Sequence, residues 1–130
     1  MLNIQNLTKH TGVGKSYVVK VSLSKRGMIS ITDGAVRRYG LADKDWAVLY
    51  YDNTDNIVVI EPKAEKVEDA LKLRKRTTGA YIAAQSFVGN FQIELKGTTV
   101  CELKRDAESG FLYFELNTGK VRKGNQNEEL

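Results

Sequence analysis

A glycine-rich stretch near the N-terminus, residues 11–16 (TGVGKS), has the residue types of a phosphate-binding loop. Such a loop places its first glycine five residues before the Gly-Lys-Ser step, because the backbone N–H groups between them wrap the phosphates. Lys9 stands at that place here. The loop must also open a helix, whereas residues 17–23 alternate polar and β-branched side chains, which is typical of a strand. The pattern favours a turn that leads into a strand over a nucleotide site.

Residues that carry acid–base, nucleophilic or metal chemistry are few in this chain. His10 is the only histidine and Cys101 the only cysteine, which excludes a Cys/His zinc set and an intramolecular disulfide. Cys101 lies in an apolar alternation and is expected in the core. The closely spaced acidic residues fall in loops, where Asp favours turns: Asp43 with Asp45, and Asp52 with Asp55. We therefore expect no enzyme activity, no metal, no cofactor and no small-molecule substrate.

The charge balance indicates the class of partner. The chain of 130 residues has a formal net charge of +4 and a sequence pI near 9.2, which favours polyanionic partners without identifying one. No apolar run reaches the roughly 18 residues of a membrane helix, and the N-terminal residues lack the basic-then-apolar order of a signal peptide. We expect a cytoplasmic protein that forms one compact unit and has no membrane partner.

Two parts of the sequence repeat at a constant shift of 52 positions. Residues 20–52 align with residues 72–104 without a gap, and glycines, apolar residues and turns keep the same order. The aligned pairs are Gly27 with Gly79, Val36 with Val88, Tyr39 with Phe91, Leu41 with Ile93, Lys44 with Lys96, and Val48 with Val100. After a turn of different length, residues 57–61 meet residues 111–115. Identities are few, so chance similarity stays an alternative to a true repeat.

Each repeat is predicted to hold a strand, a tight turn, a second strand, a short helix and a terminal hairpin. In the first repeat these are strands over 19–23 and 28–32, a helix that Asp33 caps and Gly40 ends, and a hairpin of residues 46–52 and 56–61. In the second repeat they include a helix over 86–91 and a hairpin of residues 98–104 and 111–116. The helical spacing of Val67, Ala70 and Leu71 predicts a helix over residues 65–72 with a strand after it.

The expected organisation is mainly β, with short helices, and has five parts. These are a flexible segment over 1–16, a first unit over 17–62, a linker over 63–71, a second unit over 72–116 and a disordered polar tail over 117–130. A unit of about 45 residues cannot bury enough surface alone. Each unit therefore needs a partner unit.

The first unit resembles the AbrB/SpoVT family of swapped-hairpin DNA-binding domains. The similar segments are residues 25–31 (KRGMISI), 35–41 (AVRRYGL), 46–49 (WAVL) and 57–60 (IVVI). The tandem arrangement resembles the MraZ branch of that superfamily, and residues 33–37 (DGAVR) are similar to its Asp-x-x-x-Arg signature. The resemblance implies two tandem units whose hairpins interleave into one intertwined, barrel-like domain, either as a homodimer or as a pseudo-dimeric single chain.

Several positions depart from the family pattern. Thr32 replaces the proline usual just after the second strand, and in the second unit Gln85 and Gly89 replace the Asp and Arg of the signature. The turn of the second unit, residues 77–79, is not basic, and its charge stands earlier, over residues 72–76. The resemblance thus covers about residues 17–62 well and residues 72–116 only by pattern.

Basic residues at the turns provide the predicted chemistry. Lysine and arginine there meet DNA phosphates, and arginine also reads guanine in the major groove. Together with the resemblance, this predicts a transcription regulator whose partner is double-stranded DNA. The predicted contacts are Lys25, Arg26, Arg37, Arg38, Lys72, Arg74, Lys75 and Arg76. If the units pair as in the family, these clusters are expected on one face.

Two other functions stay open. A protein-interaction or assembly module, such as an antitoxin-like or viral accessory protein, would use the same fold. A single-stranded nucleic-acid binder would stack bases on tyrosines, for which the candidates are Tyr17, Tyr50, Tyr51, Tyr81 and Tyr113. Strand alternation predicts that one of the adjacent Tyr50 and Tyr51 is buried and the other exposed.

Overall fold

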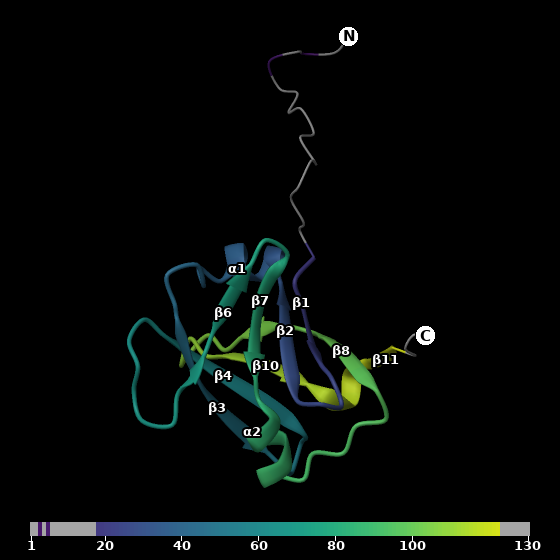
Figure 1. Ribbon diagram of the computed structural model, residues 1–130. Coiled ribbons are helices and arrows are strands. Elements are labelled where there is room, and N and C mark those ends of the chain that lie inside the picture. The colour runs from purple at the N-terminus through teal and green to yellow at the C-terminus, as the bar shows by residue number, and fades with distance from the viewer. Residues whose placement is uncertain (1–2, 4, 6–17, 123–130) are drawn as a thin grey trace.

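The computed structural model describes residues 3, 5 and 18–122, which form a mainly β structure with short helices (Figure 1). The strands are β1 (Lys20–Leu23), β2 (Met28–Thr32), β3 (Trp46–Asp52), β4 (Ile57–Lys63), β5 (Leu71–Lys72), β6 (Arg74–Arg76), β7 (Gly79–Ala83), β8 (Thr98–Glu102), β9 (Lys104–Arg105), β10 (Leu112–Glu115) and β11 (Lys120–Arg122). The helices are α1 (Asp33–Arg38), α2 (Gln85–Asn90) and the 3-10 helix η2 (Leu116–Thr118). The mainly β fold class predicted from the sequence is confirmed.

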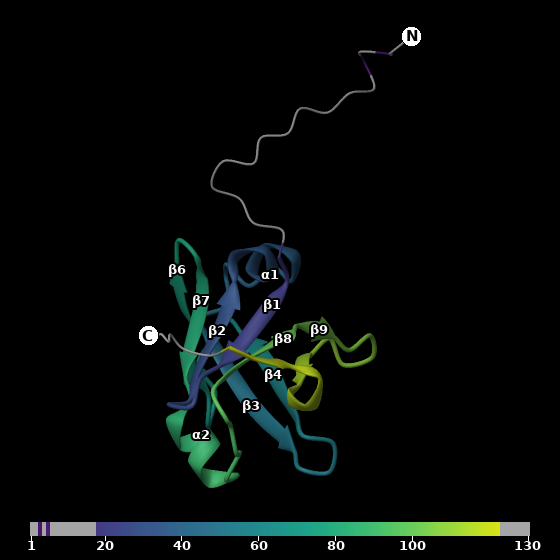
Figure 2. The same ribbon diagram turned by 90° about the vertical axis from the view of Figure 1, so that its right-hand side faces the viewer.

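Two antiparallel sheets contain these strands. The six-stranded sheet has the order β11-β8-β1-β2-β7-β6, and the five-stranded sheet has the order β5-β3-β4-β10-β9. β2 leads into α1 and β7 leads into α2, and these two strands run antiparallel to one another. The helices therefore lie at opposite ends of the molecule, as Figures 1 and 2 show.

Two buried leucines mark the points where the chain passes from one sheet to the other. Leu73 separates β5, in the five-stranded sheet, from β6, in the six-stranded sheet, and Leu103 separates β8 from β9 in the same way. Their side chains are 1% and 2% exposed. A strand that changes sheet joins the two layers at a corner, and the leucine fills that corner.

Alternating apolar side chains build the core between the sheets. The inward residues of β1 and β2 are Val21, Leu23, Ile29 and Ile31. The buried residues of β4 and β10 are Val58, Ile60, Leu112 and Phe114. Cys101 is buried among the inward residues of β8, as its alternation predicts. Because a slip of one residue would turn these apolar side chains outward, the core also fixes the strand register.

Two glycines let each hairpin approach the helix of the other repeat. Gly27 has a φ of +89°, and a Cβ there would lie 2.7 Å from the Cα of Gln85, the first residue of α2. Gly79 has a φ of +145°. A Cβ there would lie 2.0 Å from the Ile31 carbonyl oxygen and 3.1 Å from the backbone nitrogen of Asp33, the first residue of α1. Any side chain at these two positions therefore forces the backbone to move.

Thr32, rather than Asp33, caps α1. Its Oγ1 accepts hydrogen bonds from the backbone N–H groups of Ala35 (3.4 Å) and Lys20 (3.1 Å), and its hydroxyl donates to the carbonyl oxygen of Val18. The side chain thus joins the start of β1 to the start of α1. The proline of the family pattern has no hydroxyl and could not form these bonds.

The helix predicted over residues 65–72 is wrong. A turn closes where the Ala70 N–H donates to the Val67 carbonyl oxygen (3.1 Å), and β5 begins at the next residue, Leu71, which pairs with Ala47 of β3. Val67 is 39% exposed and does not face the core. A short isolated helix is weak, so pairing with β3 prevails over the helical spacing.

Part of the predicted disordered tail is ordered. Residues 117–122 include most of η2 and all of β11, which pairs with β8 through Lys120 and Val100. Gly119 allows this approach, since a Cβ there would lie 2.6 Å from the Cys101 sulfur. The polar composition of the segment is that of an edge strand, whose charged side chains face solvent. The stretch at 11–16, His10, Tyr17 and residues 123–130 lie outside the described residues.

Gly79→Ala is expected to lower the free energy of unfolding by about 2 kcal/mol or more, because the methyl group meets the backbone of Ile31 at a strained φ. Gly89→Ala is the matched control. Apart from its chain neighbours and the backbone of its own helix, no atom lies within 4 Å of a Cβ at Gly89 inside α2, so alanine there should be neutral or stabilise by up to about 1 kcal/mol. Urea unfolding followed by circular dichroism measures both variants, and equal stability would contradict the role of Gly79.

Candidate nucleic-acid interface

The outer face of the six-stranded sheet is the side that points away from the core. Cross-strand pairing places one residue of each strand in a row across it: Lys120, Val100, Ser22, Ser30, Tyr81 and Arg74. The neighbouring row contains Glu102, Lys20, Thr32, Gly79 and Arg76. Small side chains occupy the middle of both rows. The centre of this face is therefore low, and the longer side chains stand at its two sides.

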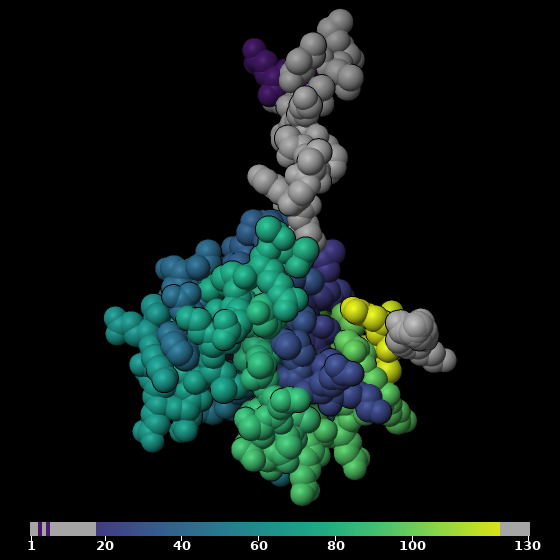
Figure 3. Space-filling model, viewed as in Figure 1, coloured from purple at the N-terminus to yellow at the C-terminus, as the bar shows by residue number. Residues whose placement is uncertain are grey.

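Basic residues occupy both sides of the outer face. They are Lys120 and Arg122 on the edge strand β11, and Arg74 and Arg76 on the edge strand β6, while Lys20 on β1 lies nearer the middle of the sheet. Glu102 is the only acidic residue in the two rows. A shallow depression of about 540 Å³ lies on this face and is lined by Ser22, Ser30 and Arg122 among others. Figure 3 views this side, with the β6–β7 hairpin, the β1–β2 hairpin and β11 following one another across the surface.

The two basic clusters predicted at the turns border this sheet at separate places. Lys25 and Arg26 are exposed in the turn between β1 and β2, at the end of the sheet where α2 begins. Arg74 and Arg76 lie on β6, the edge strand, three strands away from β1. From the usual strand spacing and rise per residue, the two clusters lie on the order of 15–20 Å apart. They border one sheet without forming a single patch.

Two other predicted contacts point away from the outer face. Lys75 alternates with its neighbours on β6, and its ammonium lies 3.3 Å from the Asp45 carboxylate. Lys72 belongs to the five-stranded sheet, where its ammonium lies 4.8 Å from the centre of the Trp46 ring. Neither side chain is placed to act together with Arg74 and Arg76.

The two arginines predicted on α1 differ in their surroundings. Arg37 forms an ion pair with Asp33 one helical turn earlier, which at the surface contributes only a few tenths of a kcal/mol. Arg38 is exposed and lines a depression that Lys20 also lines. Arg38 therefore extends the basic surface from the outer face toward the α1 end of the molecule.

Five basic residues of the outer face and of the adjoining depression beside α1 are not among the predicted contacts. They are Lys20, Lys104, Arg105, Lys120 and Arg122. Lys20 could have been predicted from the sequence, because the alternation of the apolar Val21 and Leu23 places its side chain on the outward side of the strand. The other four lie on β9 and β11, strands of two and three residues that exist through long-range pairing. Strands this short show no periodicity in the sequence.

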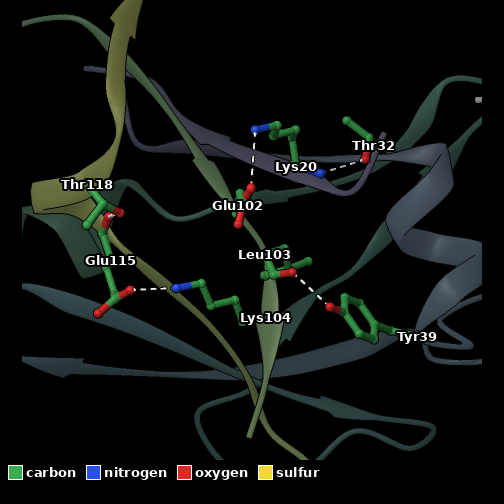
Figure 4. A network of polar contacts seen from close by, with 8 residues as sticks. All are labelled: Lys20, Thr32, Tyr39, Glu102, Leu103, Lys104, Glu115 and Thr118. Atoms are coloured by element: carbon green, nitrogen blue, oxygen red, sulfur yellow. Dashed lines mark hydrogen bonds and ion pairs between the residues drawn. The ribbon is translucent and has the colours of Figure 1, made fainter. Parts of the chain in front are cut away.

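Polar contacts hold several of these side chains (Figure 4). The Lys104 ammonium donates to the Glu115 carboxylate at 2.9 Å, and this hydrogen bond raises the pKa of Lys104. The Lys20 ammonium lies 4.0 Å from the Glu102 carboxylate. All four groups are partly exposed, so water screens both pairs and the lysines still attract anions.

The candidate tyrosines do not form one stacking surface. Tyr81 lies on the outer face, and the guanidinium carbon of Arg76 lies 3.8 Å from its ring centre. Tyr50 and Tyr113 belong to the five-stranded sheet. Tyr50 is 45% exposed, and Tyr51 is half-buried against the aromatic side chains of the α2 region. As the alternation predicts, the two side chains point to opposite faces of the strand, although Tyr51 is only partly buried. Bases of a single-stranded nucleic acid could therefore stack on individual rings but not on a row of adjacent rings.

Comparison of the chain with protein-family models, curated proteins and solved structures finds no match. A function for this chain must therefore be argued from the positions and chemistry of its residues. In the described part of the chain, no group of three or more His, Cys, Asp or Glu side chains is arranged to hold a metal ion. The same residues include no helix that is long and apolar enough to cross a membrane.

Cys101 is expected to resist alkylation by iodoacetamide at pH 8 in the folded protein and to react once urea unfolds it. Burial raises the pKa of its thiol to about 11, so little thiolate exists at pH 8. The thiol of the unfolded chain ionises first, and the free energy of unfolding should therefore fall as the pH rises from about 9 to about 11. Mass spectrometry measures the labelling, and Cys101→Ser is the control for the pH dependence. Rapid labelling of the folded protein would contradict the burial of this thiol.

Proposed function

We propose that the chain is a double-stranded DNA-binding protein, a cytoplasmic transcription regulator, whose contact surface is the outer face of the six-stranded sheet. The observation that carries this proposal is the placement of basic residues on both sides of a low, polar centre. Lysine and arginine that meet phosphates release condensed counterions, which favours binding. Glu102 is the only acidic side chain in the two rows that would oppose it.

The spacing of the basic side chains suits a groove of duplex DNA. Lys20 and Arg76 stand in one row and are separated by three strand spacings, or about 14 Å. The major groove of B-DNA is about 12 Å wide. Side chains at this separation have the span to reach phosphates on both sides of one groove. Thr32 and Gly79 lie between them and are short enough to let the strands approach the base edges.

We assign the recognition of DNA bases to the turn between β1 and β2. Lys25 and Arg26 are exposed there and project beyond the end of the sheet. Arginine recognises guanine through two hydrogen bonds to O6 and N7, whereas lysine and arginine at phosphates carry no sequence information. Arg26 is therefore our candidate for base contact, and the basic residues of the outer face position the duplex.

We also propose the tandem swapped-hairpin arrangement, in which each repeat completes the sheets of the other. Reciprocal contacts between positions 52 apart support it. The hydroxyl of Tyr39, just after α1, donates to the Leu103 carbonyl oxygen at 2.8 Å. The ring of Phe91, just after α2, lies 5.5 Å from the ring of Tyr51. Phe91 is 52 positions after Tyr39, and Leu103 is 52 positions after Tyr51.

Strand pairing also supports this arrangement. β1, which opens the first repeat, pairs with β8 of the second, and β5, near the start of the second repeat, pairs with β3 of the first. α1 and α2 begin 52 positions apart. One chain then supplies both units as a pseudo-dimeric monomer, and a homodimer is the alternative.

Charge reversal on the outer face is expected to weaken binding of a random DNA duplex and to flatten its salt dependence. Lys120→Glu with Arg122→Glu, and separately Arg74→Glu with Arg76→Glu, should each lower the affinity about tenfold or more. The slope of log affinity against log salt should fall by about 0.9 for each phosphate that the variant no longer neutralises. Fluorescence anisotropy across a salt series measures both quantities for duplex and single-stranded oligonucleotides.

Lys63→Glu with Lys66→Glu is the matched control, because it makes the same charge change at one end of the five-stranded sheet. Its salt slope should stay close to that of the parent chain. An equal decrease in affinity in the control and in both outer-face variants would mean that net charge alone drives binding. Absence of duplex binding by the parent chain at low salt would overturn the regulator proposal, and a preference for single strands would replace the duplex as the partner.

A second candidate function is assembly of copies of this chain, which the outer side of the five-stranded sheet favours. Its central side chains are mainly apolar or aromatic and partly exposed, with Glu61 paired to Val48 among them: Val48, Tyr50, Val59, Phe111 and Tyr113. One end of this side carries Lys63, Lys66 and Lys72, and the other end carries Asp52, Asp55 and Glu115. A two-fold axis across the strands would place the basic end of one copy against the acidic end of the other.

Assembly predicts that sedimentation detects a species of two 14.6 kDa chains at micromolar to millimolar concentration. Val59→Lys should return it to the mass of one chain, because a charge replaces an apolar side chain at the centre of the interface. Ser30→Lys, on the outer face of the other sheet, is the control and should leave the mass unchanged. A single-chain mass at every concentration would remove this candidate.

A further inference from the structure

A depression of about 450 Å³ lies between the end of α1 and β9 and combines apolar walls with basic side chains. Val18, Val19 and Tyr39 supply the apolar part of its lining. The basic residues around it are Lys20, Arg38, Lys104 and Arg105, and among the described residues Glu102 is the one acidic residue of the lining. This excess of basic residues gives the small surface a preference for anions.

Arg105 is held in position by Tyr39. Its Nη2 donates to the Tyr39 carbonyl oxygen at 2.9 Å, and its guanidinium carbon lies 4.9 Å from the centre of the Tyr39 ring. The Tyr39 hydroxyl in turn donates to the Leu103 carbonyl oxygen, next to Lys104 (Figure 4). A guanidinium has five N–H groups, so Arg105 retains donors for a ligand after this bond. The bond also covers a carbonyl near the C-terminal end of α1 that would otherwise repel an anion.

The charges in the depression remain available to a ligand. Lys104 lines the depression, and its ammonium extends toward Glu115 on the side away from Tyr39 (Figure 4), so this lysine adds charge near the depression without pointing into it. Lys20 is 4.0 Å from Glu102, whose side chain is 69% exposed. Arg38 has no ion pair with any described residue and is exposed. Its guanidinium can therefore turn toward an anion without breaking an existing pair.

A second depression shows that packing does not require these charges. It has a volume of about 430 Å³ and lies between α2 and the turn before β5. Ala70, Leu71, Asn90 and Phe91 line it, and they stand 52 positions after Val18, Val19, Arg38 and Tyr39 of the first depression. Among the described residues that line it, Asp69 is the only charged one. The same backbone arrangement is thus stable with asparagine where the first depression has Arg38.

From this contrast we propose that the depression between α1 and β9 is a phosphate-binding site. Arg38 and Arg105 provide planar guanidinium groups that suit two-point binding of phosphate oxygens, and Lys20 and Lys104 add charge. The phosphate group belongs either to the DNA backbone or to a free phosphorylated molecule. The first source rests on the proposed DNA binding. A duplex on the outer face would pass close to this depression, because Lys20 lines both this depression and the one on the outer face.

The test uses the full chain with two probes, inorganic pyrophosphate and a random DNA duplex. Pyrophosphate should shift the amide NMR signals of Arg38, Tyr39 and Arg105. Arg38→Glu should weaken pyrophosphate binding tenfold or more and lower the salt slope of duplex binding by about 0.9. Asn90→Glu, at the matching position of the second depression, should change pyrophosphate affinity less than twofold. Arg38→Lys should retain part of the affinity, because it keeps the charge without the planar group.

The outcomes separate this site from the proposed function. If Arg38→Glu weakens pyrophosphate binding and also lowers the salt slope, the site holds backbone phosphate. If it weakens pyrophosphate binding with an unchanged duplex slope, or with no duplex binding by the parent chain, the site holds a free phosphorylated molecule. If Arg38→Glu changes neither probe, or if Asn90→Glu has the same effect, the site is overturned. In that case the DNA proposal stands or falls on the outer-face variants alone.

Discussion

The structure depends on the antiparallel pairing of β2 with β7. These strands are neighbours inside the six-stranded sheet, and between them Ile29 and Ile82 face one another with no exposed surface. The contact reaches a glycine at each end: the Ala84 N–H donates to the Gly27 carbonyl oxygen at 2.7 Å, and Gly79 pairs with the last residue of β2. A side chain at either glycine would meet the first residue of the opposite helix. One set of contacts therefore fixes the pairing, both hairpin turns and both helix starts together.

Once this pairing is formed, the alternation of side chains along each strand determines which residues lie on the inner and outer faces of the sheet. Ile29 and Ile82 point into the core, so their neighbours Ser30 and Tyr81 must point outward, and the same rule turns Lys20 and Arg74 outward on the flanking strands. The inward positions are taken by the apolar residues that a domain of this size needs for its core. Apart from Lys75, the charged residues of the six-stranded sheet therefore gather on its outer face. The basic surface is a consequence of the register as much as of the composition.

Local patterns in the sequence were enough to predict most of the longer elements. The hairpin predicted from residues 98–104 and 111–116 is wrong for β8, which pairs with β1 and β11, so that only β9 pairs with β10. The two helices, the β1–β2 hairpin and the β3–β4 hairpin follow from alternation, turn residues and the repeat of glycines 52 positions apart. β5, β9 and β11 have two or three residues each and exist only because a distant strand binds them. For the same reason the sequence could place Lys75 beside Arg74 but could not show that it points toward Asp45. The basic residues of β9 and β11 could not be predicted as part of the basic surface, because strands this short show no alternation in the sequence.

The two repeats agree where the backbone is constrained and differ where it is not. Gly27 and Gly79 agree because a Cβ at either position collides. Tyr39 and Phe91 occupy matching places, yet Tyr39 bonds a carbonyl and supports Arg105, whereas Phe91 is 48% exposed. The depression beside α1 is therefore basic and polar, whereas the depression beside α2 is lined by aromatic and uncharged residues together with Asp69. Two identical units would offer a polyanion the same charge at both ends. A single chain with two different units offers a different arrangement of charge at each end, with Arg38 and Arg105 beside α1 and Lys25 and Arg26 beside the start of α2. Under the proposed DNA binding, this difference would fix the direction in which the protein lies on DNA.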